Sequence, residues 1–349
     1  MIKLFQPNNH SISKIKYKEV GPQIYAELSK ILSKEYDLNN IKSIAQVQET
    51  EINSNNFKVE TQENIFLLRK SNPDREEKLK RVYNISEHCR KKGVPTPKII
   101  PSKKGLIVKE KQIYTLFEFI PGNHFKGSSL KEIEELGRGI AKIHKALISY
   151  DGEVLPEPPR DIRSEQPYSS EGFFKIKEIA SGKKDNIRDI ILNESKYLIE
   201  RAEKVKQTIA RSNVRKQPIH LDLHLHNTIF KNKKLKAIID FETCCISELV
   251  RDVAYSLHRA IRQYVIKQNP SDIKKTVNKG KKSFLDAYEE INKLTEKEKK
   301  LIPLFIQDEG LHRAWLVASN YYLKGNLDWI KDLEKQIACI KEGEYFEDD

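Results

Sequence analysis

The sequence predicts an α+β protein with two unequal parts, a small mixed part followed by a larger, mainly helical part. Short β-like runs dominate residues 41–119, whereas helical periodicity dominates the chain after Pro121 and Gly122. At 349 residues, the chain is long enough to bury two such parts. We therefore place the division between residues 1–119 and residues 120–349.

The N-terminal part is predicted to alternate helices and strands. Apolar residues at helical spacing predict a first helix over residues 24–37. A second helix is predicted over residues 71–93, where Pro73 suits the first turn and Gly93 suits the C-terminal stop. Strands are predicted over residues 41–47, 56–61 and 64–70, and within 94–101 and 106–122. The short polar turns between the first three strands favour an antiparallel meander.

The C-terminal part is predicted to be helical over three stretches, which are residues 130–147, 186–211 and most of 251–340. Residues 151–170 are polar and rich in proline, as in a surface loop. Residues 218–242 are the only β-like stretch that we predict in this half.

Composition excludes several classes of protein. The net charge of +13 comes from lysines spread along the chain, without the basic and aromatic interleaving of a nucleic-acid groove. No apolar run reaches membrane-spanning length, and the N-terminus lacks the apolar segment of a secretory signal. The four cysteines form no CxxC pair, which indicates reduced thiols. We therefore expect a cytoplasmic protein, monomeric or homodimeric, with no nucleic-acid or membrane partner.

The segment IHLDLHLHNTIF, residues 219–230, has two interpretations. In an extended strand, His220, Asp222, His224 and His226 share one face and resemble the His/Asp cluster of a metal-dependent hydrolase. Such a site needs further ligands, and the other histidines are scattered singly along the chain.

The second interpretation is a phosphotransferase loop. His220, Asp222 and Asn227 have the spacing of the kinase catalytic loop, in which the aspartate receives a hydroxyl proton. Residues 228–239 read as a hairpin that returns Asp240 beside Asn227. A carboxylate and an amide oxygen that converge in this way suit Mg²⁺.

The segments HLDLHLHN and AIIDFE resemble the HGDLHxxN and IDFE signatures of the aminoglycoside phosphotransferase/choline kinase-like superfamily, which has a protein-kinase-like fold. This resemblance implies a bilobal enzyme that uses ATP and Mg²⁺, with an N-terminal nucleotide-binding lobe and a C-terminal catalytic and substrate lobe. It implies that Asp222 is the catalytic base, that His220 braces the loop, and that Asn227 and Asp240 hold Mg²⁺.

The same resemblance implies residues that bind the nucleotide. Arg69 takes the place of the phosphate-binding lysine, with Lys70 beside it, and the acidic partner of this base is Glu76 or, by preference, Glu77. The hinge backbone around adenine falls on three consecutive residues, Glu118, Phe119 and Ile120. The phosphate loop, residues 49–56, contains no glycine, and Asn53, Asn55 and Asn56 stand where a glycine is common.

We expect three supporting residues around this site. Asp252 is predicted to brace the catalytic loop, and His144 to be a hydrogen-bonded core histidine. Glu242 either faces the acceptor or forms a salt bridge.

The leading hypothesis is a kinase for a hydroxyl of a small metabolite, such as an amino alcohol, a sugar or an aminoglycoside. The alternatives are a kinase-fold binding or scaffold protein, motivated by Arg69 and the glycine-free loop, and the His/Asp hydrolase.

Overall fold

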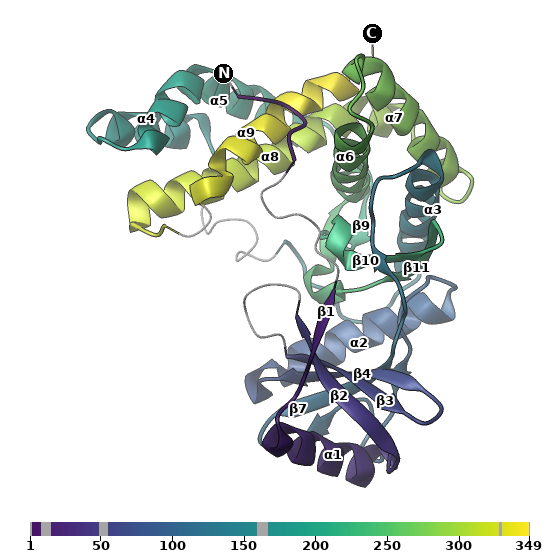
Figure 1. The fold of residues 1–349 in the computed structure, drawn as a ribbon. Helices are drawn as coiled ribbons and strands as arrows, with labels where there is room; N and C mark the ends of the chain where they lie inside the picture. The colour runs from purple at the N-terminus through teal and green to yellow at the C-terminus, as the bar shows by residue number, and fades with distance from the viewer. Residues whose placement is uncertain (1, 8–14, 49–54, 159–166, 328–329, 349) are drawn as a thin grey trace.

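A computed structural model of the chain describes residues 2–7, 15–48, 55–158, 167–327 and 330–348. It confirms the predicted α+β class, with an antiparallel sheet in the N-terminal part and a mainly helical C-terminal part (Figure 1). Both termini lie on the helical part. Phe5 is buried there, and its N–H donates to the carboxylate of Glu342 (2.6 Å). The start of the chain therefore packs away from the sheet that follows it.

The N-terminal sheet has the strand order β1-β2-β3-β4-β7-β5, with β6 also paired to β7 and every pairing antiparallel. The predicted meander of three strands is confirmed by β2 to β4. Strand β1 was not predicted, because its four residues are all exposed and show no apolar alternation. The strands are β1 (Lys16–Glu19), β2 (Ile41–Gln48), β3 (Asn56–Thr61), β4 (Ile65–Ser71), β5 (Ile99–Ile100), β6 (Val108–Lys109) and β7 (Ile113–Glu118).

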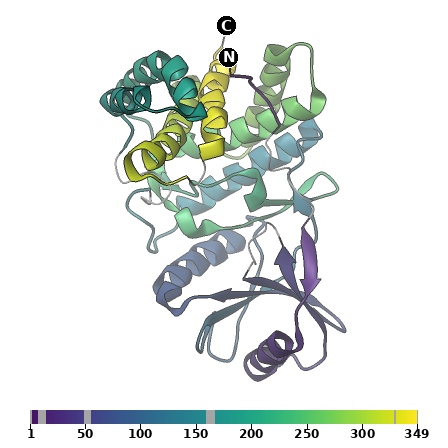
Figure 2. The same cartoon turned by 60° about the vertical axis from the view of Figure 1, so that its left-hand side comes forward.

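Two helices pack against this sheet. Helix α1 (Pro22–Tyr36) buries Leu28 and Leu32 in the same cluster as Leu68 of β4. Helix α2 (Glu76–Lys91) lies between the sheet and the helical part (Figure 2). Because side chains alternate along a strand, Lys70 shares the α1 side with Leu68, whereas Arg69 points the other way. This alternation decides which of the two bases faces the helical part.

The three helical stretches predicted for the C-terminal part are confirmed: α3 and α5 account for the first two, and α6 to α9 share the third. Helix α4 was not predicted. The helices are α3 (Leu130–Leu147), α4 (Ser170–Ser181), α5 (Asn186–Ala210), α6 (Leu249–Gln268), α7 (Ile273–Glu289), α8 (Glu296–Lys324) and α9 (Leu333–Glu342). None of the described helices is both long and apolar enough to cross a membrane. The four cysteines are free and buried, as the sequence indicated.

Short strands carry the motif region. The strands are β8 (Asn123–His124), β9 (Lys216–Ile219), β10 (Thr228–Lys231), β11 (Lys234–Ile238) and β12 (Cys245–Glu248). The β10–β11 hairpin is confirmed, and its turn uses Asn232 and Lys233 at positive φ. The prediction that residues 218–242 hold all the strands of this half is wrong. Strands β8 and β12 lie outside that range, and their two and four residues are too short for a periodic signal.

Candidate active site

The loop between β9 and β10 carries the predicted catalytic residues and is fixed from α6. The fully buried Asp252 accepts hydrogen bonds from the N–H groups of His220 and Leu221, both at 2.8 Å. Leu221 has a φ of 70°, in the left-handed region that costs a non-glycine residue roughly 1–2 kcal/mol. His144 of α3 lies 3.2 Å from the same carboxylate and 2.7 Å from the hydroxyl of Tyr288. The predicted bracing by Asp252 and the bonded state of His144 are both confirmed.

His220 joins the loop to the end of β11. Its side chain is fully buried, and its Nε2–H donates to the carbonyl of Ile239 (3.1 Å), one residue before Asp240. Burial lowers the pKa of His220 and outweighs the opposing charges of Asp252, Asp222 and Asp240. The imidazole is therefore neutral and serves as a brace.

Asp222, Asn227 and Asp240 meet where the loop joins the hairpin. The Asn227 side-chain nitrogen donates to the backbone oxygen of Asp222 (2.8 Å) and to its carboxylate Oδ2 (3.3 Å). The Ile239 N–H donates to the Asn227 carbonyl (3.0 Å), which sets Asp240 beside Asn227. Because two acceptors engage the amide nitrogen, the side-chain oxygen of Asn227 is left for a cation.

Asp240 has a left-handed backbone conformation and a carboxylate with no partner among the described residues. Its φ is 67°, and it begins a short 3₁₀ turn after β11. Within the described residues, its carboxylate has neither a hydrogen-bond nor an ion-pair partner. A carboxylate without a protein partner, next to a free amide oxygen, is a donor set that a hard divalent cation prefers.

His224 acts on the carboxylate of Asp222. Its Nδ1 accepts the N–H of His226 (3.2 Å), so its proton resides on Nε2, which lies 3.4 Å from Oδ2 of Asp222. Burial opposes ionisation of Asp222, but the hydrogen bond from His224 and the positive charge of Arg313 prevail and lower its pKa to about 2. From the sequence, His224 was considered only as a member of the possible His/Asp metal cluster and was given no role beside Asp222. The sequence signal for this contact was the histidine two residues after Asp222.

Of the two basic residues of β4, Arg69 is the one that faces the helical part, and its acidic partner differs from the prediction. Arg69 Nη2 lies 3.1 Å from Oε1 of Glu242, which also binds Arg75 and lies 2.9 Å from Nζ of Lys78. Burial would raise the pKa of Glu242, but Lys78, Arg69 and Arg75 together lower it. Glu242 is thus an anion held among three cations, and its carboxylate has its partners within the protein.

Two predicted nucleotide-binding residues lie elsewhere. Lys70 faces α1, where its Nζ is 2.9 Å from Glu27 and lies over the ring of Tyr114. The Glu77 side chain is 86% exposed and pairs with Lys80. The assignments of Lys70 and Glu77 to the nucleotide site are therefore wrong, because strand alternation turns one away and Glu77 lies at the exposed start of α2. Glu76 is also excluded as the partner of Arg69, since it pairs with Lys80 and Lys109.

At the predicted hinge, two of the three N–H groups are already bonded. The Glu118 N–H donates to Lys98 (2.9 Å), and the Phe119 N–H donates to Ile65 (3.2 Å). The Ile120 N–H has no acceptor among the described residues, and Pro121 follows it with no N–H of its own. Ile120 is therefore the N–H donor that this hinge offers. In the phosphate loop, residues 49–54 lie outside the described part, so the prediction for Asn53 has no structural counterpart.

The histidine-cluster interpretation of the motif is wrong for the described residues. His220 turns to the Ile239 carbonyl and His224 to Asp222. The rings of His224 and His226 lie 5.5 Å apart, but the described motif residues form no group of donor atoms with metal-ligand spacing. The one group with metal-ligand spacing in the described chain is His258, Cys339 and Glu342. The Glu342 carboxylate there accepts from His258, Arg262 and the Phe5 N–H, which makes it a buried ionic network.

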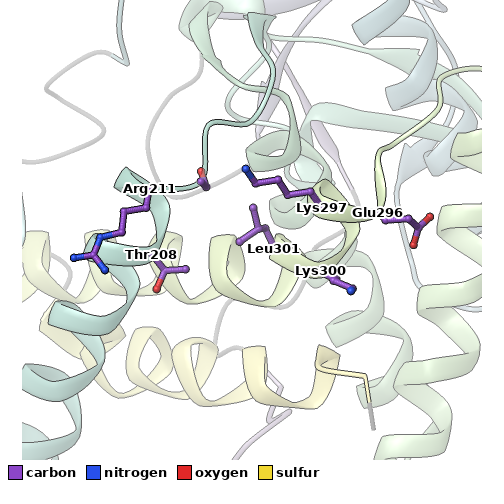
Figure 3. A pocket seen from close by; sticks show the side chains of 7 residues that line it. Thr208, Arg211, Glu296, Lys297, Lys300 and Leu301 are labelled. Atoms are coloured by element: carbon purple, nitrogen blue, oxygen red, sulfur yellow. The ribbon is translucent and has the colours of Figure 1, made fainter.

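A surface hollow of about 480 Å³ lies between the end of α5 and the start of α8 (Figure 3). It contains none of the predicted site residues, and its charged lining is at the helix surface. We assign it no role in the chemistry. Its lining consists of Thr208, Arg211, Ser212, Glu296, Lys297, Lys300 and Leu301.

A braced aspartate loop, followed by a hairpin that returns a second aspartate, is the arrangement of kinase-like phosphotransferases, and fold and site together define this class. The chain belongs to the phosphotransferase enzyme family (APH), whose model matches residues 44–273. It is a phosphotransferase whose acceptor is an alcohol group of a small metabolite.

Curated relatives cover nearly the whole chain. A homoserine kinase of Xanthobacter autotrophicus is 25% identical over 332 residues, which are 93% of this chain and 92% of the relative. A homoserine kinase of Agrobacterium fabrum is 24% identical over 302 residues, with 85% and 83% covered.

Solved structures show the same fold. An amicoumacin kinase in complex with AMP-PNP and Ca²⁺ matches with a TM-score of 0.64 at 12% identity, over 94% of this chain and 95% of that one. A choline kinase from Streptococcus pneumoniae matches with a TM-score of 0.56 at 13% identity, over 92% and 99%. At these identities, the likeness concerns the fold.

Proposed function

We propose that this phosphotransferase uses Mg-ATP and phosphorylates the side-chain hydroxyl of a homoserine-like amino acid. The observation that carries the proposal is the meeting of Asp222, Asn227 and Asp240 at one end of the β10–β11 hairpin. The curated relatives named homoserine kinases support the acceptor.

Asp222 is proposed to orient the acceptor hydroxyl and receive its proton. Its pKa of about 2 makes it a weak base, so it is ionised at neutral pH and takes the proton as the new O–P bond forms. His224 and Asn227 hold its carboxylate in place. Catalysis of this kind depends mainly on positioning and on charge stabilisation.

Asn227 and Asp240 are proposed to hold Mg²⁺, which would neutralise charge on the transferred phosphoryl group. The donor set fits the ion: one carboxylate without a protein partner and one amide oxygen, with the remaining positions left to water and phosphate.

The sheet is proposed to hold the nucleotide. Arg69 points from β4 toward the helical part and is oriented there by Glu242 (3.1 Å). A guanidinium offers two parallel N–H groups to phosphate oxygens. The Ile120 N–H is proposed to bind the adenine edge. The division into a nucleotide-binding lobe (1–119) and a catalytic and substrate lobe (120–349) is part of this proposal.

The binding or scaffold alternative rested on Arg69 and the glycine-free loop. Arg69 is a guanidinium held 3.1 Å from Glu242, in the turn that begins at Asp240, and this supports a phosphate-binding role and therefore turnover. Calorimetry with Mg-ATP separates the two hypotheses, because a scaffold that has lost its nucleotide site releases no binding heat.

The proposal is tested with a panel of alcohols that contains L-homoserine, choline, 3-aminopropan-1-ol and spectinomycin. ADP release and ³¹P NMR of the product are measured with and without Mg²⁺. We expect Mg-dependent formation of a phosphate ester with L-homoserine at the highest kcat/KM. A stronger preference for choline or spectinomycin would contradict the acceptor, and no ester with any alcohol would contradict the kinase mechanism.

A further inference from the structure

Arg259 on α6 is a partly buried cation that forms no ion pair with a carboxylate of the described residues, although the charge of Glu309 acts on it. Three arginines of the same helical part each have a carboxylate: Arg251 pairs with Asp308, Arg262 with Glu342 and Arg313 with Glu309. No described carboxylate lies within ion-pair distance of Arg259. Its neighbours are the ring of Tyr255, 5.3 Å from the guanidinium carbon, and Sγ of Cys339, 3.5 Å from Nη1.

A charge removed from water is costly unless it finds an opposite charge. The side chain of Arg259 is long enough to reach solvent from a surface helix, yet it packs on an aromatic face inside the helical part. Stacking on the ring accounts for part of the stabilisation of Arg259. It leaves N–H groups at the edge of the guanidinium that could still bind an anion. An anionic group of a ligand is the partner that this arrangement lacks.

Tyr255 connects Arg259 to the catalytic base. A second guanidinium, that of Arg313, lies 5.1 Å from the same ring, and its Nη2 donates to the Tyr255 hydroxyl (3.0 Å). Arg313 is near enough to Asp222 for its charge to help lower the pKa of that carboxyl. Burial raises the pKa of Tyr255, the charges of Arg313 and Arg259 oppose the rise, and the charge of Asp222 adds to it. The two guanidinium groups thus share one ring, and the charge of one of them, Arg313, acts on Asp222.

A third cation adds to this charge. The pKa of Lys335 on α9 is lowered, first by burial and then by the charge of Arg259, and Lys335 in turn helps lower the pKa of His226. Arg313 is paired with Glu309 and Lys335 with Asp332, so Arg259 is the cation of this group that forms no ion pair with a described carboxylate. A cationic acceptor such as a plain amino alcohol would meet repulsion there, whereas a carboxylate would be attracted.

We infer that Arg259, assisted by Arg313, recognises a carboxylate of the acceptor and so selects hydroxy acids over amino alcohols. The inference rests on the proposed function in one respect, namely that the acceptor hydroxyl binds at Asp222. A compound with its hydroxyl and its carboxylate a few bonds apart would place the first at Asp222 and the second at Arg259. The paired N–H groups of a guanidinium match the two oxygens of a carboxylate.

The test compares two acceptors that differ by one group, L-homoserine and 3-aminopropan-1-ol, which lacks the carboxylate. Steady-state phosphorylation is measured for the wild-type chain, Arg259→Gln and Arg259→Lys. Arg211→Gln is the matched control, because Arg211 is an exposed arginine at the end of α5. Thermal melting of each variant reports whether it is folded.

We expect Arg259→Gln to raise the KM for L-homoserine by at least about 30-fold, as for loss of one partner of a desolvated charge pair. Its kcat/KM for 3-aminopropan-1-ol should stay within about threefold, and Arg259→Lys should recover part of the L-homoserine KM. Arg211→Gln should match wild type with both acceptors.

Equal losses with both acceptors would mean that Arg259 only supports the fold, and this overturns the inference. A wild-type chain that uses both acceptors equally well would also overturn it, while leaving the kinase function intact. Phosphorylation of neither acceptor, by a folded chain that receives Mg-ATP, would instead refute the proposed function.

Discussion

The catalytic loop and the nucleotide side of this site are built in opposite ways. The residues of the loop are close together in the sequence: Asp222 and Asn227 are five residues apart, and the hairpin returns Asp240 thirteen residues after Asn227. The nucleotide side is long-range, because Arg69 of the sheet finds its carboxylate at Glu242, 173 residues away in the other part of the molecule. Local spacing therefore defines the proposed chemistry, and tertiary packing defines the position of the proposed phosphate contact.

The difference has a functional consequence. Glu242 lies two residues after Asp240, so the turn that would carry the metal ligand also carries the carboxylate that orients Arg69. A closed ion pair between the sheet and this turn ties the proposed nucleotide site to the proposed metal site. The loop, by contrast, is held by residues of its own part of the molecule: Asp252 accepts from the N–H groups of His220 and Leu221, and His144 contacts the same carboxylate.

The largest effect is expected at the metal position, where the loop meets the hairpin. In Asp240→Asn the carboxylate that would bind Mg²⁺ is lost, and we expect kcat to fall on the order of 10³-fold. The concentration of Mg²⁺ needed for half-maximal activity should rise. Asp189→Asn, at a side chain that is 70% exposed, is the matched control and should match wild type. An unchanged Mg²⁺ requirement in Asp240→Asn would remove this residue from the site.

The next effect tests how the loop is held. Asp252→Asn removes one acceptor from a fully buried carboxylate that binds two N–H groups, and one of these would be left unbonded. We expect the free energy of unfolding to fall by about 2–3 kcal/mol and kcat to fall with it. Urea unfolding and steady-state rates measure the two. Asp286→Asn, on an exposed position of α7, is the control. Normal stability with normal kcat would show that the loop needs no brace.

A direct comparison of Glu242, the observed partner of Arg69, with Glu77, the predicted one, tests how the nucleotide side is built. Glu242→Gln removes the anion that orients Arg69, so we expect kcat to fall by about 10- to 100-fold through mispositioning. The KM for ATP should change less, by about threefold, because the cations remain. Glu77→Gln, which removes only the exposed partner of Lys80, should leave both constants unchanged. Equal effects of the two substitutions would contradict the observed pairing.

The smallest effect concerns pH. The pKa of Asp222 is lowered to about 2 from its ordinary 3.8, so the ionised, active form persists as the pH falls from neutral toward that value. In His224→Asn a main cause of the lowering is removed, and the pKa of Asp222 should rise toward 3.8. We expect similar kcat/KM at pH 7 and a loss in the variant, relative to wild type, near about pH 4. An acid limb at the same pH in both proteins would exclude His224 as the cause.

The sequence predicted the loop better than the sheet side for a physical reason. The hairpin and the catalytic spacing depend on residues close in the chain, and the observed β10–β11 register places Asp240 where the spacing implied. Lys70 and Glu77 were misplaced because the direction of a side chain depends on strand alternation and on which face of a helix is exposed. Where two bases or two acids are adjacent in the sequence, the sequence does not show which of them faces the site. Glu242 has three cationic partners from β4 and the region of α2, and no short pattern encodes such a set.

Asp222→Asn, measured in two ways on one protein, tests the central claim most directly. Calorimetry gives its Kd for Mg-ATP, and single-turnover assays give its rate of phosphoryl transfer to L-homoserine. If Asp222 is the base, and Asn227 with Asp240 holds the metal, the Kd should stay within about threefold of wild type. The transfer rate should fall by about 10²- to 10⁴-fold. A variant that binds Mg-ATP and transfers phosphate at the wild-type rate would contradict this mechanism.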